Sequence, residues 1–393
     1  MERREFVKTV GLGAIGLTVA GRGEAFADAS ENPAANLGAK ASPLQATLRW
    51  GMIGTGKRCW QHIKVVQRFP ECRIAALCDI RKERLDHALD MCKSDPPAAY
   101  EDYKELLKRD DLDIILVATP NYLHCEMVIA GLESGRHVLT EKPMGITVEE
   151  CNAMIAAAGK CGKILQVGLQ LRYAPFYQKV HQLLADGAIG KCQFVWFNEF
   201  RGDWAKQSND PEVDNKINWR FYNKLSGGTL LEKSCHFFDL FRWFVRTEPL
   251  SVCAMGGINH YSNGRETLDH ASVIVEFDGG CKATHGLSMY SPHMKGFVLI
   301  GEKGALDLDW DTGEIVLRRP GKQPETLRAD VTNKDTGGHI GTYELHESFL
   351  ECIKTGKPPL TDPVAGKESI RIGLAAELAI RERRWVQMSE IPA

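Results

Sequence analysis

The feature that most constrains the fold is an alternation of short apolar runs with helical patterns that begins at Leu48. Each apolar run is long enough for one strand and is followed by a stretch with apolar residues at helical spacing. Because parallel strands need a crossover connection, usually a helix, this alternation predicts a doubly wound parallel sheet. The predicted strands are residues 48–53, 73–78, 114–118 and 137–140, and the predicted helices are residues 58–69, 81–92 and 123–134.

Four polar or glycine-containing motifs follow directly after these predicted strands. In open sheets of this kind, ligands bind beyond the carboxyl ends of the strands. We therefore expect the four motifs to line one ligand site. They are Gly54-Thr55-Gly56, Asp79, Thr119-Pro120-Asn121 and Glu141-Lys142-Pro143.

The first motif is typical of a dinucleotide site. Gly54 permits a tight turn, and Gly56 lets the backbone approach a pyrophosphate at the start of the next helix. Cys59 stands where the third glycine of the fingerprint is expected. Asp79 can accept both ribose hydroxyls, which favours NAD, whereas Arg81 nearby leaves NADP open. The predicted cofactor residues in this part of the chain are Gly54, Thr55, Gly56, Lys57, Arg58, Asp79 and Arg81.

Lys142 lies at the end of a predicted strand, beside the expected position of a nicotinamide. The usual alternative for a lysine is a solvated surface side chain. Here Glu141 precedes it and Pro143 restricts the backbone after it. We interpret Lys142 as a partly desolvated ammonium that orients a substrate hydroxyl and helps in proton transfer.

A second polar cluster lies in the very apolar segment 226–244. Gly227-Gly228 is predicted to open one helix, on which Glu232, His236 and Asp239 fall at positions i, i+4 and i+7. A lone histidine on an apolar face is usually a satisfied core residue. With flanking carboxylates at contact spacing, we expect Glu232 or Asp239 to fix the imidazole tautomer, so that His236 serves as a general base.

Together these motifs resemble the Gfo/Idh/MocA family of glucose-fructose oxidoreductase and inositol dehydrogenase, over about residues 48–385. The resemblance implies that Lys142 and His236 are catalytic and that Glu232 occupies the place of the family's usual aspartate. It also implies that Glu141 and Gln170 line the cofactor. The predicted cofactor residues on this side of the site are Thr119, Pro120, Asn121, His124, Glu141, Lys142 and Gln170.

The resemblance further implies two domains: an NAD(P)-binding Rossmann domain at residues 48–168, and a substrate-binding α+β domain at residues 169–393 with a large, mostly antiparallel open sheet. The outer face of that sheet commonly makes an oligomer interface, so we expect a homo-oligomer, either a dimer or a tetramer. The sequence independently predicts strands at residues 192–200, 251–261, 270–277, 282–290, 296–301, 305–310 and 314–318, a hairpin turn at Asp278-Gly279-Gly280, and helices at residues 342–354 and 368–384.

An aromatic and polar loop, residues 201–225, precedes the histidine segment. Its aromatic residues, such as Trp204 and Tyr222, have two possible roles. Aromatic faces suit sugar rings, but by default such residues are packing anchors. Arg172 is equally open, as a substrate contact or as a domain-bridging ion pair. The predicted substrate-binding residues are Arg172, Trp219, Arg220 and Asp239.

The N-terminal residues are predicted to be a targeting signal. Arg3-Arg4 precedes a mildly apolar, glycine-rich stretch that ends at Ala25-Phe26-Ala27, which is typical of a twin-arginine export signal over residues 1–27. Residues 28–47 are rich in Ala, Pro, Asn and Ser and are predicted to be a linker. The apolar stretch is too short for a membrane anchor. We therefore expect a periplasmic or otherwise exported protein.

Charge and cysteine content narrow the function classes. The formal net charge of −2 argues against a nucleic-acid or anionic-membrane partner. The 12 cysteines have no CxxC pair, which suits a protein that folds in a reducing cytosol and is exported folded. No cluster of metal-ligand spacing is present, so no metal is expected.

The sequence therefore predicts removal of hydride from a carbinol carbon of a sugar or cyclitol to a nicotinamide, with His236 taking the hydroxyl proton, Lys142 aiding it and Glu232 orienting it. Export implies a tightly bound cofactor and a redox-balanced reaction: two-substrate oxidoreduction, epimerisation, or glycoside hydrolysis by transient oxidation and elimination. Oxidoreduction is favoured, because Glu141-Lys142-Pro143 looks like the dehydrogenase branch of the family. A sensor without catalysis remains a further alternative, against which the intact Lys142 and His236 argue.

Overall fold

The computed structural model describes residues 47–202, 217–261, 264–332 and 339–393. The predicted export signal, almost all of the predicted linker and Trp204 lie outside these ranges. Within them, no helix is both long enough and apolar enough to cross a membrane.

The first part of the chain forms a six-stranded parallel sheet with the order β3-β2-β1-β4-β5-β6. This is the strand order of the Rossmann fold, and it confirms the predicted doubly wound sheet. The strands are β1 Leu48–Ile53, β2 Cys72–Cys78, β3 Ala98–Tyr100, β4 Ile114–Val117, β5 His137–Thr140 and β6 Leu165–Val167.

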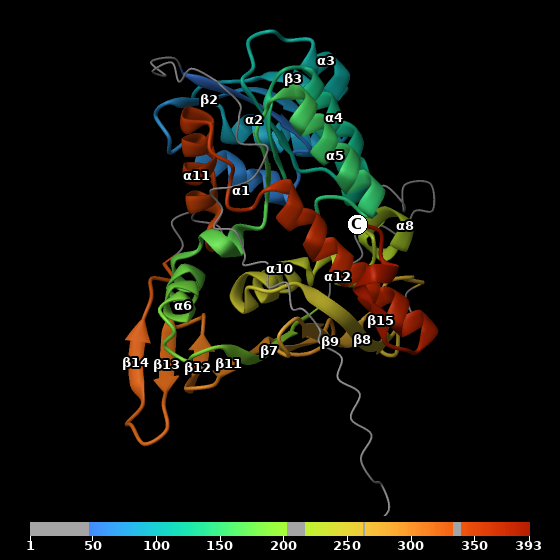
Figure 1. The fold of residues 1–393 in the computed structure, drawn as a ribbon. Helices are drawn as coiled ribbons and strands as arrows, with labels where there is room; N and C mark the ends of the chain where they lie inside the picture. The colour runs from blue at the N-terminus through green and yellow to red at the C-terminus, as the bar shows by residue number, and fades with distance from the viewer. Residues whose placement is uncertain (1–46, 203–216, 262–263, 333–338) are drawn as a thin grey trace, which may run out of the picture. The chain divides into compact units, whose positions relative to one another are not determined.

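Helices cover both faces of this sheet because its strands are apolar on both sides. Ile115 and Val117 of β4 pack into a cluster with α3, α4 and α5, whereas Ile114 and Leu116 pack into a cluster with α1, α2 and α11. The helix α11 therefore returns from the end of the chain to the first sheet, beside α1 (Figure 1). These helices are α1 Lys57–Val66, α2 Lys82–Met91, α3 Tyr103–Leu107, α4 His124–Glu133, α5 Val148–Cys161 and α11 Thr342–Thr355.

The second part forms a nine-stranded sheet with the order β14-β13-β12-β11-β7-β10-β9-β8-β15. Only the central β7 and β10 pair in parallel; the other paired neighbours are antiparallel. The predicted, mostly antiparallel sheet is thereby confirmed. Its strands are β7 Cys192–Phe200, β8 Pro249–Gly257, β9 His270–Phe277, β10 Lys282–Ser288, β11 Met294–Gly301, β12 Gly304–Asp309, β13 Glu314–Arg318, β14 Glu325–Arg328 and β15 Val386–Gln387.

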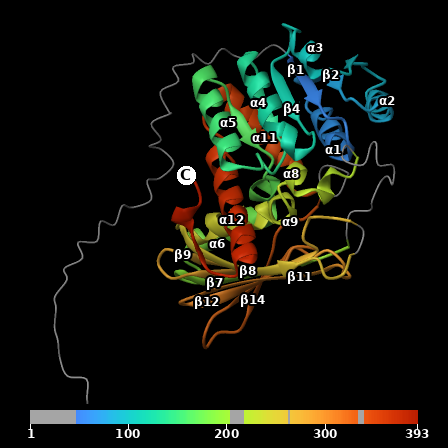
Figure 2. The same ribbon diagram turned by 90° about the vertical axis from the view of Figure 1, so that its right-hand side faces the viewer.

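One face of the nine-stranded sheet carries the largest apolar core of the described residues. The helices α6 Pro175–Ala185, α10 Cys235–Val245 and α12 Pro363–Glu382 pack on this face. The long α12 also contacts α5 and β6, so one helix packs against both sheets (Figure 2). The predicted hairpin between β9 and β10 is confirmed, and Gly279 and Gly280 adopt φ values of 78° and 90°, which glycine accommodates without steric cost.

The helix predicted from Gly227-Gly228 onward is wrong in one respect. The structure has two helices after the glycines instead of one, α9 Thr229–Glu232 and α10, and a separate short helix before them, α8 Asn223–Ser226. Lys233 and Ser234, between Glu232 and His236, belong to neither helix, although both keep backbone angles in the right-handed helical region. These residues therefore do not form the continuous helical stripe that their spacing predicts.

Candidate active site

The loop after β1 has the geometry that a pyrophosphate cradle requires. Gly54 has φ +86°, and a Cβ atom there would lie 2.8 Å from the backbone carbon and oxygen of Ala118. The helix α1 follows at once, and its N-cap residue Gly56 supplies no side-chain cap, so the first amides of the helix keep their donors for an anion. Lys57, the first residue of α1, is exposed. The residues present thus fit a dinucleotide.

Asp79, at the end of β2, holds this loop in place. Its Oδ2 accepts the backbone N–H of Thr55 at 2.7 Å, and its Oδ1 accepts the backbone N–H of Arg81 at 2.9 Å. A carboxylate with two oxygens retains lone pairs for a ribose hydroxyl. Arg84, which the sequence interpretation missed, lies against the same loop, with Nη1 3.0 Å from where a Cβ of Gly56 would be.

Lys142 connects the end of β5 with the segment that carries the histidine. Its Nζ donates to the backbone carbonyl of Glu232 at 2.6 Å and lies 3.8 Å from Oε2 of the same residue. The Lys142 side chain is only 18 % exposed. A mostly buried ammonium on this segment agrees with the desolvated lysine that the sequence predicts, rather than with a solvated one.

Glu232 is the centre of a buried charged cluster. Its carboxylate accepts from Arg220 Nε at 2.8 Å and from Asn121 Nδ2 at 2.9 Å. Burial would raise the pKa of Glu232, but the charges of Lys142 and Arg220 hold it below its usual range. The cluster thus joins two predicted cofactor residues, Asn121 and Lys142, to a predicted substrate residue, Arg220.

His236 is 8 % exposed, at the start of α10. Burial, followed by the charges of Lys142 and Lys233, lowers its pKa well below the usual value, so the imidazole is neutral near pH 7. Its Nδ1 has no hydrogen-bond partner among the described residues. The prediction that Glu232 or Asp239 orients the imidazole is therefore wrong. Glu232 contacts Arg220, Asn121 and Lys142, and Asp239 contacts a different side chain.

Asp239 forms a bidentate ion pair with Arg172. Its two oxygens accept from Arg172 Nε at 2.8 Å and Nη2 at 2.6 Å, and both side chains are buried. Arg172 Nη1 also donates to the backbone carbonyl of Leu360 at 3.3 Å. Arg172 therefore forms an ion pair, but with a residue of the same predicted domain, residues 169–393, so this pair does not bridge the two domains. Both oxygens of Asp239 are directed to Arg172, and its contact with a substrate stays a prediction.

His124 also differs from its predicted role as a cofactor contact. The side chain is fully buried, and its ring nitrogens lie 2.8 Å from the carbonyl of Pro143 and 3.0 Å from the carbonyl of Thr119. It therefore braces two of the motifs that line the site instead of lining the site itself. The peptide bond between Lys142 and Pro143 is cis.

Two further predicted residues are buried. Gln170 has no hydrogen-bond partner for Oε1 among the described residues, which leaves an acceptor for a ligand. Trp219 is 6 % exposed, and the Arg220 guanidinium lies 4.1 Å from the centre of its ring. This contact supports a packing role for Trp219. Arg220 remains part of the charged cluster around Glu232.

The sequence interpretation missed a second ion pair close to His236. Lys233, from the break between α9 and α10, lies 3.0 Å from Glu199 Oε1 on β7. Burial lowers the pKa of Lys233, against the charge of Glu199. No local pattern indicated this pair, because its two residues lie on separate elements of the second part.

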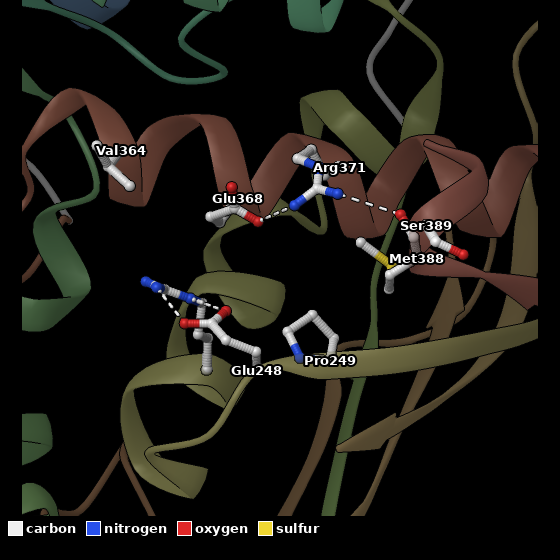
Figure 3. Close-up of a pocket in the computed structure, with 8 residues that line it drawn as sticks. Glu248, Pro249, Val364, Glu368, Arg371, Met388 and Ser389 are labelled. Atoms are coloured by element: carbon white, nitrogen blue, oxygen red, sulfur yellow. Dashed lines mark hydrogen bonds and ion pairs between the residues drawn. The ribbon is translucent and has the colours of Figure 1, made fainter. Parts of the chain in front are cut away.

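A pocket of about 290 Å³ lies away from these residues, between α12, the start of β8 and the C-terminal residues (Figure 3). Its charged side chains pair with one another: Arg242 with Glu248, and Glu368 with Arg371. None of the predicted site residues lines it, and we assign it no part in the site. No group of three or more His, Cys, Asp or Glu side chains in the described ranges has the arrangement of a metal site.

Comparisons with known proteins agree with this geometry. Residues 48–169 match the model of an oxidoreductase family with an NAD-binding Rossmann fold, and residues 177–307 match the C-terminal domain of the same Gfo/Idh/MocA family. The chain therefore belongs to the Gfo/Idh/MocA family of oxidoreductases.

Three similar proteins illustrate the range of the family. Myo-inositol 2-dehydrogenase of Thermotoga maritima is 24 % identical over 88 % of this chain and 99 % of its own. The solved structure of aldose-aldose oxidoreductase from Caulobacter crescentus has 25 % identity and a TM-score of 0.74 over 87 % of this chain and 99 % of its own. A glycosyl hydrolase family 109 protein of Shewanella pealeana is 30 % identical, but over only 56 % of this chain and 50 % of its own.

Proposed function

We propose that the protein oxidises a carbinol carbon of a sugar or cyclitol, with an NAD cofactor that stays bound through the reaction. A bound nicotinamide supplies the hydride chemistry. The observation that carries the proposal is the 2.6 Å hydrogen bond from Lys142 Nζ to the Glu232 carbonyl, which joins the end of a Rossmann strand to the segment of His236. Two relatives, an inositol dehydrogenase and an aldose-aldose oxidoreductase, support this class of substrate.

The residues of the chain divide the proton transfer between them. His236 is neutral because of burial and nearby cations, so its imidazole can accept the hydroxyl proton. Lys142 Nζ donates a hydrogen bond to the alcohol oxygen and stabilises the negative charge that develops there. Glu232 positions Lys142 and balances its charge, which is a different part from the orientation of the imidazole that the sequence predicts.

The cofactor binds along the strand ends. The glycine loop and the first amides of α1 would hold the pyrophosphate, Asp79 would accept from the adenosine ribose, and the buried Gln170 Oε1 would offer a further acceptor. Asp79 favours NAD, because a carboxylate repels a 2′-phosphate. Arg81 and Arg84 beside it keep NADP as the alternative, which the ratio of the two dissociation constants distinguishes.

The experiment that tests the proposal is a two-substrate absorbance assay on the purified protein. We expect the near-ultraviolet absorbance of reduced nicotinamide to appear when one sugar is added and to bleach when a second, oxidised sugar is added, without free NAD. Absence of any absorbance change with a broad set of aldoses, cyclitols and their oxidised forms would contradict the proposal.

Glycoside hydrolysis by transient oxidation and elimination is the second candidate. The similarity to a glycosyl hydrolase family 109 protein favours it, although that similarity covers half of the relative. The same His236 and Lys142 would serve, because oxidation of a ring hydroxyl acidifies the neighbouring C–H. Release of nitrophenol from nitrophenyl glycosides, with no net change in nicotinamide absorbance, would identify this activity.

We further propose export by the twin-arginine route and assembly as a homo-oligomer. Arg3-Arg4 supports export, and the expected result is that changing both residues to lysine retains the protein in the cytoplasm. The outer face of the nine-stranded sheet exposes Trp196, Ile274 and Ile300, which supports an interface between copies. Light scattering on the purified protein should give the mass of a dimer or a tetramer, and the mass of one chain would contradict the assembly.

A further inference from the structure

Glu141, the residue before Lys142, begins a series of hydrogen-bonded buried side chains that have no part in the proposed reaction. Glu141 Oε1 is 2.9 Å from His62 Nε2, and His62 Nδ1 is 3.2 Å from His346 Nε2. His346 Nδ1 is 2.8 Å from the backbone carbonyl of Thr342. Both histidines are fully buried, and Glu141 is 5 % exposed.

The number of protons in this series follows from its endpoints. The Thr342 carbonyl can only accept, so His346 Nδ1 must carry a hydrogen. Each of the other two contacts also needs one hydrogen between its atoms, so the three contacts hold three hydrogens in total. Two neutral imidazoles supply two of them. One further proton must therefore reside on Glu141, His62 or His346.

The surrounding charges decide where this proton lies. Arg58 Nε donates to the same Glu141 oxygen at 2.7 Å, and the backbone N–H of Lys142 donates to the other oxygen at 3.3 Å. Burial would raise the pKa of Glu141, but Arg58, His62 and Lys142 hold it well below its usual range. An ionised Glu141 leaves the extra proton on the two imidazoles.

We propose that His62 and His346 share one proton against the ionised Glu141, and that this buried charge pair positions the catalytic Lys142 relative to α1 and α11. Glu141 is the residue before Lys142, and both of its carboxylate oxygens accept hydrogen bonds. His62 and Arg58 belong to α1, and His346 and Thr342 belong to α11. Each member is a positioning residue that acts through Lys142. The consequence for turnover rests on the proposed function, whereas the proton count does not.

The proton has a limited pH range. Burial lowers the pKa of both imidazoles; Arg58 on α1 lowers the pKa of His62 further, and the charge of His62 does the same to His346. Glu141 at the end of β5 opposes these effects on both. The aromatic Trp50 of β1, whose ring centre is 5.6 Å from that of His346, adds no charge. The extra proton is therefore present at low pH and is lost as pH rises, when Glu141 faces an imidazole lone pair.

Nitrogen NMR of the full chain with labelled histidine tests the proton count directly. In the wild-type protein we expect one imidazolium shared by His62 and His346 at the acid end of the range in which the protein stays folded, converting to two neutral rings as the pH rises. Glu141→Gln keeps the shape of the side chain but lacks the charge that holds the proton, so the pKa of this imidazolium should fall by about 1 or more. The matched control is Glu105→Gln, an exposed carboxylate paired with Lys108, which should leave these resonances unchanged.

Two neutral rings in the wild-type protein at every pH at which it stays folded would overturn the inference, and so would an imidazolium that Glu141→Gln does not shift. If Glu141→Gln does not fold, His346→Gln replaces it: the glutamine amide can donate an N–H to His62 Nδ1, so the extra proton is no longer needed and the imidazolium should be lost. An imidazolium that persists in that variant over the same pH range would contradict the proton count.

Turnover supplies a separate readout. Glu141→Gln should lower kcat about tenfold to a hundredfold with a smaller effect on the KM for the sugar, because Lys142 is displaced while the substrate contacts remain. If the NMR result holds but no sugar is turned over by the wild-type protein, the proposed function fails and the shared proton stands. If turnover holds and the NMR result fails, only the inference is lost.

Discussion

The glycine loop after β1 and the segment from α8 to α10 form two sides of the candidate site, and they are organised differently. The loop is held by local backbone geometry and by one carboxylate, Asp79, at the end of the neighbouring strand. The segment is interrupted twice, and its polar residues are held by ion pairs with distant parts of the chain: Glu232 with Lys142, and Asp239 with Arg172. The cofactor side is thus fixed by backbone conformation, and the substrate side by buried charge.

The largest effect should come from the contact that joins the two sides. Lys142→Ala removes the ammonium next to the reacting hydroxyl and should lower turnover by about 10²-fold to 10⁴-fold in the two-sugar absorbance assay. The loss of stability in thermal unfolding should be small, because Glu232 keeps Arg220 and Asn121 as hydrogen-bond partners. The control is Lys93→Ala, because that side chain is 79 % exposed. Unchanged turnover in Lys142→Ala would show that the contact between the two sides of the site has no part in catalysis.

The buried ion pair of the substrate side should matter for stability more than for substrate affinity. Arg172→Met leaves Asp239 without its cation and should cost about 3–5 kcal/mol in the free energy of unfolding, measured by urea denaturation. The double variant Arg172→Met/Asp239→Leu should recover most of this loss, because neither charge is then left unpaired. If Arg172→Met stays stable and raises the KM for the sugar instead, Arg172 is a substrate contact.

The glycine loop should respond to a single methyl group. Gly54→Ala places a Cβ 2.8 Å from the backbone of Ala118 at φ +86°, so we expect a loss of about 1–3 kcal/mol together with weakened NAD binding. Gly159→Ala is the matched control: it lies on α5, nothing lies within 4 Å of its Cβ position, and it should stabilise the protein by about 0.5–1 kcal/mol. Equal effects in calorimetry would contradict the local account of the loop.

The smallest effect concerns the acid limb of the pH profile. Lys233 is one of the cations that lower the pKa of His236. Removing it raises that pKa, so the imidazole becomes protonated at a higher pH and the acid limb of kcat/KM moves upward by up to about 1 pH unit. The variant should be Lys233→Met with Glu199→Gln, so that no buried charge loses its partner. A limb that stays in place or moves to lower pH would show that His236 is not the titrating base.

The same difference explains what the sequence could predict. The strand ends were recoverable because each apolar run is short and is followed by a polar motif, as at Ile53 before Gly54. The contacts of the histidine segment could not be predicted in this way. A spacing of i, i+4 and i+7 assumes one continuous helix, and the helix assigned before Lys233 ends there. Ion pairs such as Arg172 with Asp239, 67 residues apart, have no local signal. His62 and His346, 284 residues apart, belong together only because α11 returns to the first sheet.

The central claim, that Lys142 and His236 act on one substrate hydroxyl, is tested most directly by an experimental structure with reduced NAD and the sugar bound. The account predicts that Lys142 Nζ and an imidazole nitrogen of His236 both lie at about 3 Å from the same hydroxyl oxygen, with its carbon facing the nicotinamide. A sugar held by only one of the two, with the other facing a separate cleft, would contradict it.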